Sequence, residues 1–72
     1  MNAKALYNEF LVYCGSSMED MKFVQIEDFC QRQFPIVEEA ILGGKGIHAC
    51  DSRAHDLTCS FVELKVISLL HN

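Results

Sequence analysis

The stretch that decides the fold is LTCSFVELKVI, residues Leu57–Ile67. As a helix it is poorly amphipathic, because Leu64 and Ile67 fall on the same side of the helix as several polar residues. As a strand it alternates, because Val62, Leu64 and Val66 share one face while the charged residues between them point away. Its β-branched residues favour the same interpretation. The stretch therefore predicts a β-strand.

A partner strand is predicted just upstream, at Ile47–Cys50. A turn centred on residues 54–55 would join the two strands and place Cys50 opposite Cys59. Before Phe61 the apolar residues occupy the opposite face of the second strand, which predicts a β-bulge at that point. Together the two strands form a predicted C-terminal β-hairpin with both cysteines in its walls.

Upstream of this hairpin, helical spacing of the apolar residues predominates. Ala3–Cys14 carries them at i, i+3, i+4 and i+7, which predicts a helix that ends at Gly15. Lys22–Gln25 is β-prone and predicts a short edge strand. A second helix is predicted over Ile26–Phe34, ended or kinked before the proline, and a third over Pro35–Ile41, stopped by a pair of glycines.

This order of elements resembles that of winged helix-turn-helix domains over most of the chain. The predicted fold class is accordingly α+β, a small winged-helix-like domain with about three helices and a C-terminal β-hairpin. It forms a single domain over residues 1–72. The alternative is an all-α four-helix bundle, in which Asp56 or Thr58 caps a last helix in place of the second strand.

The composition narrows the classes of partner. Half of the residues are hydrophobic, and a chain this short cannot bury them all, so apolar surface is expected to face another protein. The net charge is -4, and the six Lys and Arg residues are scattered singly. Without a basic cluster, neither nucleic-acid nor membrane-surface binding is expected. No secretory leader is recognisable, so we expect a cytoplasmic protein with reduced thiols.

Four residues near the predicted hairpin are candidate zinc ligands: His48, Cys50, His55 and Cys59. Their spacing, H-x-C-x4-H-x3-C, resembles the zinc-knuckle pattern C-x2-C-x4-H-x4-C in its inner spacing and departs from it in the first ligand and both outer spacings. The alternative is that the two cysteines are core-facing thiols and the two histidines ordinary polar residues. No cofactor other than this structural zinc is predicted.

No catalytic constellation is recognisable in the chain. Neither Cys50 nor Cys59 lies at a predicted helix start, where a thiol would be activated as a nucleophile. The glycine-rich segment Gly43–Gly46 lacks the hydroxyl residue and the following helix of a phosphate-binding loop. The sequence therefore predicts a protein that is not an enzyme.

Acidic residues supply the candidate partner-binding surface. Two of the three acidic pairs lie on predicted helices: Glu27 with Asp28, and Glu38 with Glu39. They could bind a basic partner, and the alternative is that they are ordinary solvated helix surface.

The predicted function is protein–protein binding, as a regulator, inhibitor or adaptor. A homodimer is envisaged through the strand edge at Phe61–Leu70 or through the helix at Ala3–Cys14. Two alternatives remain, a winged-helix DNA-binding transcriptional regulator and a zinc-stabilised binding module.

Overall fold

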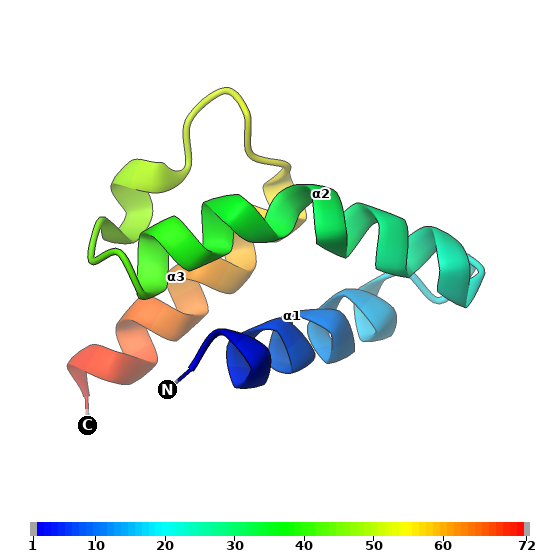
Figure 1. Ribbon diagram of the computed structural model, residues 1–72, viewed down its shortest axis with the longest axis horizontal. Coiled ribbons are helices and arrows are strands. Elements are labelled where there is room, and N and C mark those ends of the chain that lie inside the picture. Colours follow the sequence, from blue (N-terminus) through cyan, green and yellow to red (C-terminus); the bar gives the residue numbers. More distant parts are fainter. Residues whose placement is uncertain (1, 72) are drawn as a thin grey trace.

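The computed structural model describes residues 2–71, and its regular elements are all helical (Figure 1). They are the α-helices α1 (Ala3–Ser17), α2 (Phe23–Ile41) and α3 (Asp56–Leu70), with the short 3-10 helix η1 (Gly46–Ala49) before α3. No β-strand occurs within the described range. The predicted α+β, winged-helix-like fold with its C-terminal β-hairpin is therefore wrong, and the all-α alternative fits. The winged-helix form of the DNA-binding alternative is wrong with it, whereas DNA binding as such is untested.

The C-terminal stretch is helical because its inward face follows helical spacing. The positions i, i+3, i+4, i+7 and i+8 of this face are Thr58, Phe61, Val62, Lys65 and Val66, all buried or half-buried. Thr58 donates a hydrogen bond to Gln33 Oε1 at 2.9 Å, and Lys65 Nζ lies 3.1 Å from Glu9 Oε1. Thr58 and Lys65 occupy inward positions because polar side chains on other helices form hydrogen bonds with them.

Large apolar residues lie on the outer, solvent-facing side of α3. Leu64 and Ile67 are 55% and 53% exposed, so two large apolar residues lie on the solvent side. With polar residues inside and apolar residues outside, the sequence shows no amphipathic stripe. The alternation that predicted a strand was therefore a coincidence of this mixed pattern.

The start of α3 lies where a hairpin turn was predicted. His55 is the N-cap, and its Nδ1 accepts a hydrogen bond from the Leu57 N–H at 3.1 Å. The His55 N–H itself donates to Gln33 Oε1 at 3.1 Å. The alternative fold named Asp56 or Thr58 as the cap. Asp56 instead lies in the first turn, where a carboxylate suits the helix dipole.

Several other predicted boundaries are wrong. Gly15 does not stop α1, which continues to Ser17. Lys22–Gln25 is not an edge strand but the start of α2, where the Lys22 N–H donates to the Gln25 side chain at 3.0 Å. Ile47–Cys50 is not a strand either, since η1 covers most of it.

Pro35 lies inside α2, so the two predicted helices are one. Proline has no backbone N–H, so the carbonyl of Gln31, four residues earlier, loses its helical hydrogen bond. Pro35 and Gln31 are both exposed to solvent. Buried residues on both sides, among them Phe29 and Val37, hold the two halves of α2 against the same core. The predicted stop is confirmed, because α2 ends at Ile41 and Gly44 follows with φ +75°.

The three α-helices meet at Phe10, which is fully buried. Its ring centroid lies 5.0 Å from that of Phe61 on α3 and 6.5 Å from that of Phe29 on α2. Phe61 also contacts Tyr13, with centroids 5.3 Å apart. Within residues 2–71, no helix has the length and apolar character needed to cross a lipid bilayer.

Candidate functional site

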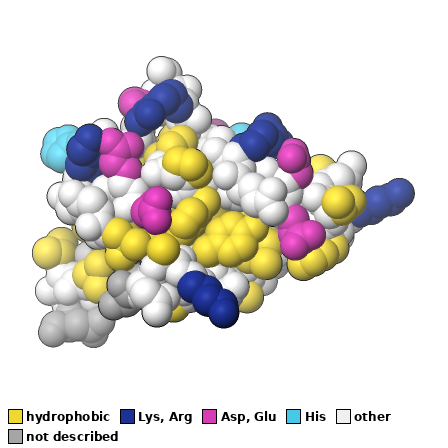
Figure 2. All heavy atoms as spheres, viewed as in Figure 1, with side chains coloured by type: hydrophobic (Ala, Val, Ile, Leu, Met, Phe, Trp, Pro, Cys, Tyr) yellow, Lys and Arg dark blue, Asp and Glu magenta, His cyan; other side chains and the backbone are white. Residues whose placement is uncertain are grey.

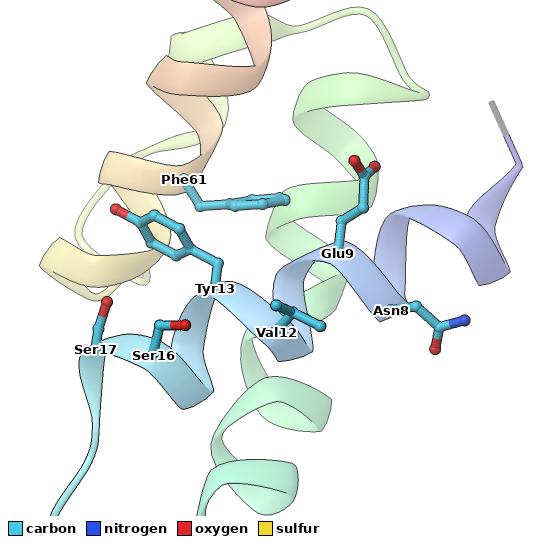
Figure 3. Close-up of a pocket in the computed structure, with 7 residues that line it drawn as sticks. All are labelled: Asn8, Glu9, Val12, Tyr13, Ser16, Ser17 and Phe61. Carbon is cyan, nitrogen blue, oxygen red and sulfur yellow. The ribbon is translucent and has the colours of Figure 1, made fainter.

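A groove of about 590 Å³ lies between α1 and α3 (Figure 3). The side chains that line it are Asn8, Glu9, Val12, Tyr13, Ser16, Ser17 and Phe61. The groove exists because α1 and α3 both pack on α2 and touch each other at few points.

The floor of the groove is apolar. Figure 3 shows the Phe61 ring reaching from α3 across α1, beside the ring of Tyr13. Val12 stands at the rim, and it is 69% exposed. Covering this exposed apolar side chain and the apolar floor beside it with another surface is favourable, because it removes apolar area from water.

The rim of the groove is polar and carries one ion pair. Lys65 Nζ lies 3.1 Å from both carboxylate oxygens of Glu9, so the pair joins α3 to α1. The Lys65 side chain is only 17% exposed, so its aliphatic part is buried along α3. Ser16 and Ser17 form the other end, which continues into the exposed carboxylates of Glu19 and Asp20.

Apolar surface is also exposed elsewhere on the molecule. On the face drawn in Figure 2, apolar side chains form a band across the middle, and charged side chains surround it. Large exposed apolar residues occur on all three α-helices: Val12, Phe23, Val24, Leu64, Ile67, Leu69 and Leu70. Val12 differs from the others in lining the groove between α1 and α3.

The four predicted zinc ligands are brought only partly together. Burial raises the pKa of Cys50 to about 12, and the Cys59 thiol acts in the same direction. His55 is engaged as the N-cap of α3, and its ring lies edge-on to Phe29 with centroids 5.1 Å apart. His48 is exposed on η1. Among residues 2–71, no three His, Cys, Asp or Glu side chains are grouped so as to hold a metal ion, and the zinc site stays a prediction.

A second pair of thiols lies between α1 and α2. Cys14 and Cys30 are both fully buried. Burial raises the pKa of Cys14 to about 12, and the Cys30 thiol beside it acts in the same direction. Burial likewise raises the pKa of Cys30. Both groups therefore remain protonated thiols and pack as small apolar side chains.

The predicted acidic surface is divided between two sides of α2. Glu27 and Glu38 share one side, and Asp28 and Glu39 share the other, because eleven residues make about three helical turns. The second side is partly neutralised. Asp28 pairs with Arg32 at 3.0 Å, while Glu39 pairs with Lys45 and, at 3.5 Å, with Arg53.

The ion pairs of Glu39 also change the acidity of its carboxyl group. The hydrogen bond and positive charge of Lys45 lower the pKa of Glu39. The pairs are solvent-exposed, and pairs of this kind contribute little to stability. The four carboxylates are therefore less available to a basic partner than their number indicates.

Sequence reasoning did not identify the groove between α1 and α3. One signal was present, because Val12 lies outside the apolar stripe of its helix and so is an apolar residue on a solvent face. Phe61 was considered only as part of a strand. Comparison of the chain with protein-family models, with curated proteins and with solved structures gave no match.

Proposed function

We propose that this chain is a small, non-enzymatic protein-binding module, a cytoplasmic regulator, inhibitor or adaptor. Its binding site is the groove between α1 and α3, and the occupant is an amphipathic helix of another protein. The observation that carries the proposal is the exposed Val12 beside the apolar floor of Tyr13 and Phe61. An apolar groove between two helices suits the binding of a third helix through its apolar face.

The dimensions of the groove support a helical occupant. Its α1 wall runs from Asn8 to Ser17, which is about 14 Å at the rise of an α-helix. Two or three successive turns of a partner helix cover that length. Apolar side chains at i, i+3 or i+4, and i+7 of the partner would then meet Val12, Tyr13 and Phe61 in turn.

The charges near the end of the groove indicate which residues flank the apolar face of the partner helix. Glu19 and Asp20 lie in the turn next to Ser17, and neither forms a salt bridge with any residue in the 2–71 range. The whole chain carries ten acidic against six basic residues. The proposed partner helix therefore carries Lys or Arg at the end that reaches these two carboxylates.

The chain offers a matched pair of variants for the test. Val12 and Val24 are exposed to 69% and 67%, and only Val12 lines the groove. In affinity purification from the native host, the wild type and Val24→Glu are expected to retain the same protein. Val12→Glu is expected to lose it, because a carboxylate would then be buried against Phe61 and Tyr13. Circular dichroism of both variants checks that each remains folded.

Equal retention by both variants would contradict the use of the groove. A second copy of the chain is the other conceivable occupant, and sedimentation velocity distinguishes it. A wild-type dimer that Val12→Glu converts to a monomer would contradict the proposal of a different partner protein. The dimer predicted through a strand edge at Phe61–Leu70 is excluded, because that segment is helical. A dimer through α1 stays a prediction.

A further inference from the structure

The end of the groove at the C-terminus of α1 is negatively charged. Ser17 lines this end, and Asn8 lies at the opposite end (Figure 3). Glu19 and Asp20 follow Ser17 so closely in the chain that their backbone lies within about 11 Å of it. Both side chains are exposed, and neither is in a salt bridge among the described residues 2–71. The last carbonyl groups of α1 add partial negative charge at the same end.

The opposite end of the groove offers hydrogen-bond donors. Glu9 lines it on α1, and Lys65 Nζ on α3 lies 3.1 Å from both carboxylate oxygens of Glu9, so the negative charge is neutralised there. An ammonium group has three N–H donors, so one remains after two hydrogen bonds to Glu9. Asn8 adds the N–H donors of its side-chain amide. This end therefore suits the free carbonyl groups at the C-terminus of a docked helix.

α1 and α3 run in opposite directions along the groove. Phe61 packs on Tyr13, with ring centroids 5.3 Å apart. Lys65, one turn later on α3, contacts Glu9, one turn earlier on α1. The N-terminus of α3 therefore lies towards the negatively charged end, where Asp56 in its first turn opposes the positive end of the helix dipole. The two free carboxylates after α1 thus decide the polarity of the groove.

We propose that the helix bound in the groove runs antiparallel to α1, with its N-terminus at Glu19 and Asp20 and its C-terminus at Asn8 and Lys65. This inference rests on the proposed function and specifies the partner further. A helix N-terminus carries backbone N–H groups without partners and a partial positive charge, which carboxylates stabilise. Cations and N–H donors stabilise a helix C-terminus in the same way. In the sequence of the partner, the Lys or Arg residues therefore precede the apolar positions.

A designed peptide tests the direction of binding without the natural partner. The probe is an amphipathic helix of about 18 residues with blocked termini, leucines along one face and a lysine pair at each end. Because its side-chain charge is the same at both ends, only the direction of the helix distinguishes the two orientations. One form of the probe carries a nitroxide amino acid near its N-terminus, and a second form carries it near its C-terminus. Each is added to the isotope-labelled protein for nuclear magnetic resonance.

The nitroxide near the peptide N-terminus is expected to broaden the amide signals of residues 16–20 most strongly. The nitroxide near the C-terminus is expected to act most strongly on residues 8, 9 and 65. Replacing both carboxylates, by Glu19→Gln with Asp20→Asn, is expected to weaken binding at least about threefold and to reduce the preference for one direction. The matched control is Glu27→Gln with Glu38→Gln, which changes the net charge equally on α2, outside the groove, and leaves both results unchanged.

The direction and the groove itself fail in different ways. The reverse pattern of broadening, or equal broadening of both ends by each label, would overturn the direction while the groove remains the binding site. Val12→Glu is expected to abolish the broadening by either label, which locates the peptide in the groove. Absence of binding to the wild type, or undiminished binding to Val12→Glu, would contradict the groove as a binding site and overturn the direction with it.

Discussion

Replacing Phe10 by alanine is expected to lower the free energy of unfolding by about 3–5 kcal/mol. Phe10 is fully buried, and its ring is the point at which Phe29 of α2 and Phe61 of α3 meet α1. The truncation removes the apolar contacts of the ring and leaves a cavity that rigid helices fill poorly. A core of this size supplies only about 3–5 kcal/mol of net stability. The variant is therefore expected to be largely unfolded at room temperature.

Urea denaturation followed by far-UV circular dichroism measures this effect. Val12→Ala is the control on the same helix, and it is expected to change stability by less than about 0.5 kcal/mol, because Val12 is mostly exposed. A loss below about 1 kcal/mol for Phe10→Ala would mean that the three helices do not converge on this ring.

Replacing Gln33 by alanine is expected to cost about 1–3 kcal/mol. Gln33 Oε1 accepts from the buried Thr58 hydroxyl at 2.9 Å and from the His55 N–H at 3.1 Å. This one side chain therefore positions both the cap and the first turn of α3. Its removal leaves the Thr58 hydroxyl buried without a partner, and the cost of an unpaired buried donor exceeds the value of the bond itself.

A double-mutant cycle with Thr58→Val tests whether the two residues act through each other. Valine keeps nearly the shape of threonine and removes the hydroxyl, so the double variant has no buried donor without a partner at residue 58, and only the exposed His55 N–H has lost its acceptor. The summed cost of the single substitutions is expected to exceed that of the double variant by about 0.5–3 kcal/mol. Strict additivity would contradict the hydrogen bond between Gln33 and α3.

The sequence predicted those elements whose buried residues are all apolar. The helix over Ala3–Cys14 and the stop of α2 before Gly43 were found from spacing and from glycine, because both signals are local. The stretch Leu57–Ile67 failed because Thr58 and Lys65 point inward, and their partners Gln33 and Glu9 lie far away in the sequence. No local pattern reveals such partners.

The candidate sites were predictable to different extents. Cys50 and Cys59 were expected to face each other in a hairpin, and that hairpin is absent: Cys50 follows the 3-10 helix η1 and Cys59 lies on α3. The groove could not be predicted, because it depends on how α1 and α3 each pack on α2. Val12 has no neighbour in sequence that indicates that it lines the same groove as Phe61.

The most direct test of the account is the nuclear magnetic resonance assignment of residues 47–70. The structure predicts helical Cα chemical shifts throughout Asp56–Leu70 and nuclear Overhauser effects between the rings of Phe10 and Phe61, whose centroids lie 5.0 Å apart. Extended Cα shifts over Leu57–Ile67, with Hα–Hα contacts between residues 48–50 and 59–61, would contradict it. In that case α3 and the groove beside it would not exist.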